Sequence, residues 1–183
     1  MKRHFYFFRH GQTNENQSGK QYGTNTESYL TETGIAQAEK LKEFLSDKEI
    51  QVVYSSPLQR AIHTAEIALN NPGVEIITDA RLIETAFGFW YGPDDENQTR
   101  INENFNRIKS CLDDIIQNDK HTNIAIASHG GVTRALCWAC GRKIGSIKNC
   151  QCFHFVLDND KWDFVEDFES GIDVQNITDT NCS

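Results

Sequence analysis

Two short apolar runs in this chain each lead into a histidine. The first, residues 5–8, is followed by Arg9 and His10, and the second, residues 123–128, is followed by His129. An imidazole can act as a nucleophile or carry a proton at neutral pH, and a guanidinium binds phosphate oxygens through a planar fork of donors. These residue types therefore suit the binding and transfer of a phosphoryl group.

Each run is predicted to be a buried strand, because it is short, apolar and bounded by polar residues. Ligands of open α/β sheets bind outside the carboxyl ends of such strands. If the two strands are neighbours, His10 and His129 lie side by side. Gly11 has no Cβ, so the chain can turn sharply there and a ligand can approach the backbone. A histidine that merely ends a strand is the alternative, but two of them with Arg9 adjacent favour function.

Strands alternate with amphipathic helices along the rest of the chain. Residues 14–29 read as a loop, Thr31 or Thr33 as the N-cap of the first helix, and Ser56 as the N-cap of the second, with Pro57 at its first position. Gly141 is expected to end the last helix. Strands are predicted at 5–8, 51–54, 74–78, 123–128, 152–157 and 161–166, and helices at 31–45, 57–69, 100–118 and 132–140.

This alternation predicts an α/β fold, a three-layer α/β/α sandwich with a mostly parallel sheet and an antiparallel C-terminal hairpin turning at residues 158–160. The length of 183 residues fits one domain, assigned to residues 1–170, with a polar tail at 171–183.

The net charge of −8 argues against general binding to nucleic acid or to an anionic membrane. A small anionic substrate remains compatible, because a local arginine cluster can act inside an acidic protein. Arg9 interrupts the first apolar run too early for a signal peptide, and no later stretch is long enough to span a bilayer. We therefore expect a cytoplasmic protein.

Four of the six cysteines are closely spaced pairs that resemble a zinc pattern, namely Cys137, Cys140, Cys150 and Cys152. The first pair lies in an apolar helical pattern, and the second leads into a strand. Ordinary core residues, reduced in the cytoplasm, are therefore the favoured interpretation.

Five blocks of the sequence carry a resemblance to a known family. They are Arg9-His10-Gly11-Gln12-Thr13, Leu30-Thr31-x-x-Gly34-x-x-Gln37-Ala38, Ser55-Ser56-Pro57-Leu58-x-Arg60-Ala61-x-x-Thr64-Ala65, Leu82-x-Glu84-x-x-Phe87-Gly88-x-Trp90 and Ser128-His129-Gly130-Gly131. In this order, over roughly residues 4–157, they resemble the histidine phosphatase superfamily, also called phosphoglycerate-mutase-like. One departure is Tyr91, where the family often has glutamate between tryptophan and glycine. It is expected to alter the pocket wall rather than catalysis.

The resemblance implies a role for each matching position. His10 falls on the nucleophile and Glu84 on the proton donor, while the phosphate-binding positions fall on Arg9, Asn16, Arg60, His129 and the backbone N–H of Gly130. It implies no metal and no cofactor, because the arginines supply the positive charge.

The function implied is hydrolysis of a small phosphorylated metabolite through a covalent phosphohistidine. A phosphoglycerate-type mutase and a non-catalytic phosphate-binding or protein-interaction module are the alternatives. Intact His10, Glu84 and His129 argue against the module. The family's mutases carry longer insertions between Gly92 and Asn123, so the short segment here favours a phosphatase. Substrate specificity is expected to lie in residues 17–29 and 87–99.

Overall fold

The computed structural model describes residues 2–17, 28–85 and 95–172. Its six strands form one sheet in the order β3-β2-β4-β1-β5-β6. The four strands from β3 to β1 run parallel, and β5 and β6 form an antiparallel hairpin at one edge, as predicted. Their bounds are β1 Arg3–Arg9, β2 Val52–Ser55, β3 Glu75–Thr78, β4 Asn123–Ser128, β5 Cys152–Asp158 and β6 Lys161–Phe168.

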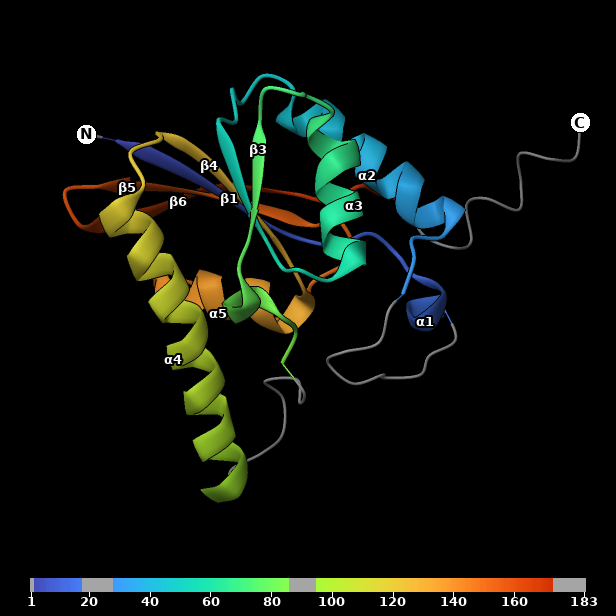
Figure 1. Cartoon of the computed structure of the whole chain (residues 1–183). Helices are drawn as coiled ribbons and strands as arrows, with labels where there is room; N and C mark the ends of the chain where they lie inside the picture. The colour runs from blue at the N-terminus through green and yellow to red at the C-terminus, as the bar shows by residue number, and fades with distance from the viewer. Residues whose placement is uncertain (1, 18–27, 86–94, 173–183) are drawn as a thin grey trace, which may run out of the picture.

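Helices cover both faces of this sheet (Figure 1). Helices α2 and α3 pack on one face, and α4 and α5 pack on the other, which gives the predicted three-layer sandwich. The helices are α1 Asn14–Gln17, α2 Glu32–Leu45, α3 Gln59–Leu69, α4 Asp95–Asn118 and α5 Gly130–Ala139, and a 3₁₀ turn spans Ala80–Leu82.

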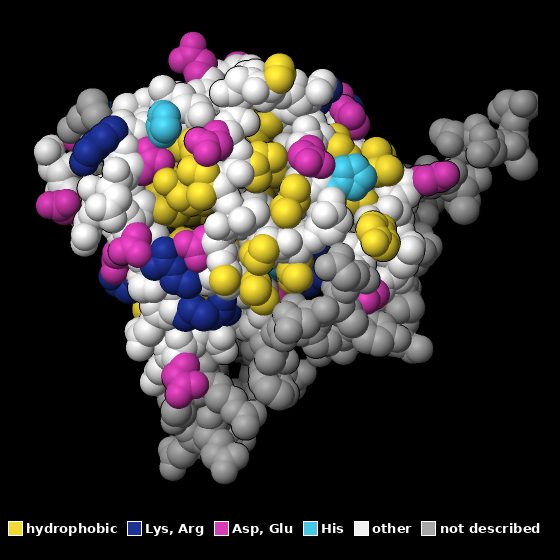
Figure 2. Space-filling view, viewed as in Figure 1, with side chains coloured by type: hydrophobic (Ala, Val, Ile, Leu, Met, Phe, Trp, Pro, Cys, Tyr) yellow, Lys and Arg dark blue, Asp and Glu magenta, His cyan; other side chains and the backbone are white. Residues whose placement is uncertain are grey.

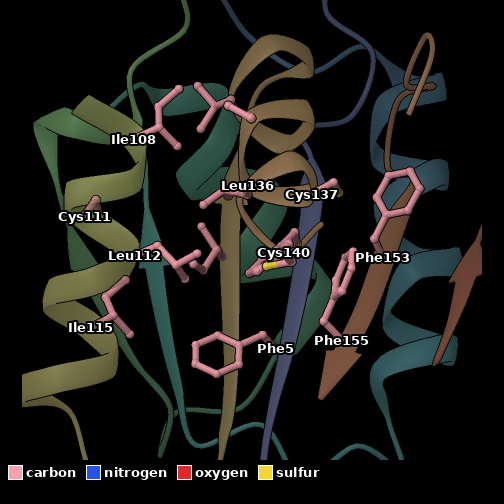
Figure 3. Close-up of a cluster of buried hydrophobic side chains, with 14 of the residues drawn as sticks. Phe5, Ile108, Cys111, Leu112, Ile115, Leu136, Cys137, Cys140, Phe153 and Phe155 are labelled. Atoms are coloured by element: carbon pink, nitrogen blue, oxygen red, sulfur yellow. The ribbon is translucent and has the colours of Figure 1, made fainter. Parts of the chain in front are cut away.

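The aromatic strand β1 divides its side chains between two cores, because successive residues of a strand point to opposite faces. Phe5 and Phe7 pack into the cluster beneath α4 and α5, and Tyr6 and Phe8 pack into the cluster beneath α2 and α3. Figure 3 shows Phe5 with residues of α4, α5 and β5 in the first cluster. Burial of each large apolar side chain contributes about 1.5–3 kcal/mol. The strand that leads to His10 is therefore firmly anchored.

Two local predictions were wrong, one about the start of α3 and one about the loop after β1. Helix α3 begins at Gln59 with Leu58 as its N-cap, so the assignment of Ser56 as cap and Pro57 as first helical residue was wrong. The predicted loop at residues 14–29 contains the short helix α1. Thr31, one of the two predicted caps of α2, is the N-cap, and its hydroxyl accepts a hydrogen bond from the N–H of Gly34.

Three other boundaries bear on the site. Helix α4 starts at Asp95, ahead of the predicted residue 100, and α5 starts at Gly130, ahead of the predicted residue 132. Helix α5 ends before Gly141, whose φ of +83° suits the glycine predicted to stop it. The tail predicted at 171–183 lies outside the described residues from 173 onwards.

The cysteine pairs lie in different cores. Cys137 and Cys140 belong to the cluster beneath α4 and α5, whereas Cys150 and Cys152 belong to the cluster on the opposite face. Among the described residues, no group of three or more His, Cys, Asp or Glu side chains is arranged to hold a metal ion. The arrangement supports the interpretation as core residues over the zinc pattern.

The edge strand β3 lies in the middle of the face shown in Figure 2, where hydrophobic side chains gather. An open groove of about 270 Å³ runs beside it and includes Leu69, Val74 and Ile76 in its lining. Within the described residues, no helix is both long enough and apolar enough to cross a bilayer.

Candidate active site

The two histidines meet at the carboxyl ends of adjacent parallel strands. Strand β1 pairs with β4 so that Arg9 lies opposite Ser128, and the N–H of His10 donates to the carbonyl of Ser128 at 2.9 Å. The rings of His10 and His129 follow at once, with centroids 5.2 Å apart and planes at 65°. The prediction that neighbouring strands bring the two imidazoles side by side is confirmed.

The turn after β1 orients the ring of His10. Its Nδ1 lies 2.7 Å from the carbonyl oxygen of Gly11, and a carbonyl can only accept, so Nδ1 carries the proton. Burial, reinforced by the charges of Arg9 and Arg60, lowers the pKa of His10 well below its usual value. The ring is therefore neutral at pH 7, with its lone pair on Nε2.

The ring of His129 is fully buried and held from one side. Its Nε2 lies 2.8 Å from the hydroxyl oxygen of Ser56, while Nδ1 is buried without a hydrogen-bond partner among the described residues. Burial, followed by the effects of His10 and Arg60, lowers the pKa of His129 well below its usual value. A second neutral imidazole therefore stands beside the first, with one nitrogen left for a ligand.

Two arginines flank the histidines. Arg9 directs one terminal nitrogen to the carbonyl of Ile147 at 2.7 Å, and its Nε is buried without a partner among the described residues. Arg60 projects from the first turn of α3, is buried, and donates to the hydroxyl of Ser28 at 3.3 Å. These two guanidiniums supply the positive charge that a phosphoryl group requires.

Glu84 reaches the same place from the loop after the 3₁₀ turn. Its Oε1 accepts from the N–H of Thr85 at 2.8 Å, and its Oε2 accepts from the N–H of Gly131 at 3.5 Å. A Cβ on Gly131 would lie 2.4 Å from Oγ1 of Thr85 and 2.7 Å from Oε1 of Glu84, so both side chains would have to shift to admit it. The predicted proton donor thus contacts the first turn of α5.

Gly130 opens α5 directly after His129. Its N–H is one of the first amides of the helix, which have no acceptor within the helix. A Cβ on Gly130 would lie 3.7 Å from Nε of Arg9, so the Arg9 side chain lies beside the first residue of α5. Backbone amides and a positive helix end together favour an anion here.

Asn16 lies at the rim of this cluster and is exposed. Its Oδ1 accepts from the N–H of Thr13 at 3.2 Å and from the side-chain amide of Asn149 at 3.3 Å. The same Asn149 amide donates to the carbonyl of His10 at 3.0 Å. Asn149 therefore joins the predicted Asn16 to the strand end that carries His10.

Sequence reasoning missed three polar side chains around the site besides Ser56. Asn149 has no local signal, because it lies far along the chain from both residues it contacts. Burial lowers the pKa of Arg107 and of Arg134, and the nearby charge of Glu84 partly opposes this shift in both. Arg134 was detectable, because it is a cation inside an otherwise apolar helix.

The structure thus brings six of the predicted residues together and leaves one at their edge. The six are Arg9, His10, Arg60, Glu84, His129 and Gly130, and the seventh is Asn16. Tyr91 and most of the two predicted specificity segments, namely residues 18–27 and 87–94, lie outside the described residues.

A mostly parallel α/β sheet with two histidines at adjacent strand ends, flanked by arginines, is the arrangement of a phosphoryl-binding protein. The model of the histidine phosphatase superfamily (branch 1) matches residues 5–110 and 95–169 of this chain. The chain belongs to this superfamily.

Individual relatives agree with this assignment. The chain is 31% identical over 184 residues to phosphoglycerate mutase-like protein 4 of Arabidopsis thaliana, covering 84% of this chain and 80% of that one. It is 26% identical over 151 residues to phosphoserine phosphatase 1 of Hydrogenobacter thermophilus, covering 70% and 71%. The fold matches a mycobacterial glucosyl-3-phosphoglycerate phosphatase solved with vanadate, at a TM-score of 0.72, 21% identity and coverage of 89% and 97%.

Proposed function

We propose that this protein hydrolyses a phosphomonoester of a small metabolite through a covalent phosphohistidine on His10. The observation that carries the proposal is the 2.7 Å contact from Nδ1 of His10 to the carbonyl of Gly11. This contact fixes the proton on Nδ1, so Nε2 offers its lone pair, and the lowered pKa of the ring keeps that lone pair available at neutral pH. A histidine that only ended a strand would need neither feature.

In the first step, Nε2 of His10 forms a bond to phosphorus while the bond from phosphorus to the ester oxygen breaks. Arg9, Arg60 and the amide of Gly130 stabilise the charge on the phosphoryl oxygens. Glu84 gives its proton to the departing alcohol. In the second step, water attacks phosphorus and returns a proton to Glu84, and the bond from phosphorus to His10 breaks to release inorganic phosphate.

The role of His10 is tested by trapping. The wild-type protein, incubated briefly with a labelled substrate and quenched in base, should retain labelled phosphate on His10. His10→Ala should lose turnover and labelling but keep its melting temperature within a few degrees. His121→Ala is the matched control, since that imidazole is half exposed and outside the site. Label recovered on any residue other than His10 would overturn the assignment.

The role of Glu84 is tested with leaving groups of different basicity. Glu84→Gln keeps the size of the side chain but cannot transfer a proton. Alkyl phosphates, which need a protonated leaving oxygen, should lose far more rate than aryl phosphates. An equal loss on both classes would show that another group is the acid.

Hydrolysis is favoured over the mutase reaction by the length of α4. This helix occupies residues 95–118, so it takes up most of the segment between Gly92 and Asn123. Little chain is left to form a lid, and a mutase must exclude the water that would hydrolyse its phosphohistidine. The test supplies 3-phosphoglycerate with a catalytic amount of the bisphosphate. Isomerisation much faster than phosphate release would favour the mutase.

The substrate class rests on the relatives named above, which include a phosphoserine phosphatase and a phosphatase of a glucosyl phosphoglycerate. A screen of phosphorylated metabolites should identify the preferred ester. We place the enzyme in the cytoplasm, because its five described cysteines are buried free thiols, which suits a reducing compartment.

A further inference from the structure

We infer that Ser56 is a positioning residue that fixes the tautomer of His129. In this arrangement the Ser56 hydroxyl donates to Nε2, so the single ring proton stays on Nδ1 and is presented to a phosphoryl oxygen. The inference rests on the proposed phosphate-binding role of His129. It concerns a residue that sequence analysis had placed in a helix cap.

The hydrogen-bond inventory around Ser56 sets the direction of this contact. The two side chains are fully buried, and Oγ of Ser56 lies 2.8 Å from Nε2 of His129. The same Oγ accepts from the N–H of Leu58 at 3.3 Å. A serine hydroxyl has one proton to donate, and the imidazole nitrogen is the acceptor within reach.

The opposite direction leaves more groups unsatisfied. If Nε2 of His129 donated to Ser56, the buried hydroxyl proton would have no acceptor among the contacts just described. Nδ1 would then carry a lone pair, which repels a phosphoryl oxygen instead of binding it. With Ser56 as donor, the only unused group is the N–H at Nδ1, which is the atom left without a partner among the described residues. Buried polar groups are rarely left unpaired unless a ligand completes them.

The charge state of His129 makes the tautomer decisive. Its lowered pKa, due to burial and then to His10 and Arg60, means that the ring carries one proton rather than two. A neutral imidazole donates from only one nitrogen, and the bond made by the other nitrogen determines which one. His129 therefore attracts the phosphoryl group in one tautomer and repels it in the other.

The backbone holds Ser56 firmly in this position. Strand β2 pairs in parallel with β4, placing Ser55 opposite Ala127, and the N–H of Ser56 donates to the carbonyl of Ala127 at 3.0 Å. The Ser55 hydroxyl is also fully buried, but it donates to the backbone carbonyl of Ser56 at 2.9 Å. Ser55 therefore provides a matched control of the same residue type and burial.

The direct test is nitrogen-15 NMR of the histidine side chains in the ligand-free full-length protein at pH 7.5. The His129 signal is assigned by its loss in His129→Asn, and it should show a neutral ring protonated at Nδ1. Ser56→Ala should shift the signal towards protonation at Nε2, whereas Ser56→Thr and Ser55→Ala should leave it unchanged. A wild-type ring protonated at Nε2, or a tautomer unchanged in Ser56→Ala, would overturn the inference.

The kinetic test asks whether the tautomer matters for phosphate. Ser56→Ala should lower kcat/KM and the affinity for orthovanadate by about tenfold, the effect expected for losing one hydrogen bond behind a ligand-binding side chain. Ser56→Thr should restore most of both. A purely structural role would lower the melting temperature but leave the tautomer as it is. If the wild-type protein hydrolyses no phosphomonoester, the proposed function fails, while the NMR result still decides the role of Ser56.

Discussion

Replacement of Gly34 by alanine should destabilise the protein and misplace His10, the proposed nucleophile. Gly34 lies in the first turn of α2, against the backbone that follows His10. A Cβ on Gly34 would lie 2.1 Å from the carbonyl oxygen of Gln12 and 2.9 Å from its amide nitrogen. In return, a Cβ on Gly11 would lie 2.6 Å from the carbonyl oxygen of Gly34. Helix α2 and the turn at residues 11–12, directly after His10, therefore meet backbone to backbone.

Two opposing terms set the size of the effect. Alanine is a better helix former than glycine by about 1 kcal/mol, which alone would stabilise α2. Forcing a methyl group into a packed region costs about 1–3 kcal/mol, and the upper end or beyond applies here because the obstructing atoms belong to the backbone. A net loss of about 2 kcal/mol follows, which for a domain of this size lowers the melting temperature by about 4–8 °C.

The assay compares thermal unfolding and kcat/KM of Gly34→Ala with those of Gly145→Ala. A Cβ at Gly145 meets nothing within 4 Å, so that variant makes the same substitution in open space. Activity of Gly34→Ala on an aryl phosphate should fall by about 100-fold at temperatures where the protein is folded, because a shift of about 1 Å at a reacting group costs this much. A Gly34→Ala protein that melts at or above the control would refute the steric argument.

Three further predictions concern acid, a turn and metal ions. Burial lowers the pKa of His10, His129 and His154, so only the unfolded chain takes up these protons as the pH falls below about 6.5. Urea unfolding should therefore show the free energy of unfolding falling by up to about 1.4 kcal/mol per pH unit for each ring. A His154→Gln variant should lose less stability than the wild type, and an equal loss would contradict the lowered pKa of His154. Asp160→Gly should raise the melting temperature by about 1–4 °C, because Asp160 has a φ of +62° in a two-residue hairpin turn that favours glycine. An unchanged or lower melting temperature would count against this argument. Chelation should leave the phosphatase rate unchanged, since two arginines balance the phosphate charge, and a rate restored only by a divalent ion would show a missing metal.

The fold was readable from the sequence because its signals are local. The aromatic run of β1 alternates between two cores. The hairpin turn lies at Asn159 and Asp160, as turn composition predicted, and the structure gives both residues a positive φ. Helix boundaries were less accurate. The early start of α4 at Asp95 was missed because its first residues are polar and carry no apolar period.

Of the site residues, the sequence predicted only those that directly follow a strand or lie in a recognisable sequence block. His10 and His129 both end strands, so the pairing of β1 with β4 was enough to bring them together. Asn149 contacts the carbonyl of His10 across 139 positions in the chain, and no periodicity carries that information. Outside the site, His4 and the buried His154, 2.9 Å apart between ring nitrogens, had no recognisable motif either.

Ser56 shows how one local rule can conceal a more distant interaction. A serine just ahead of a helix is a good capping candidate, and its hydroxyl does accept from the N–H of Leu58. The same hydroxyl also contacts His129, 73 positions away, and both bonds are possible because an O–H group accepts and donates at once. Ser55 pairs with Ala127, so Ser56, one position beyond that pair, and His129, two positions beyond it, both leave their strands at the same sheet edge. The contact of Ser56 with His129 therefore follows from the register of strand β2 rather than from helix capping.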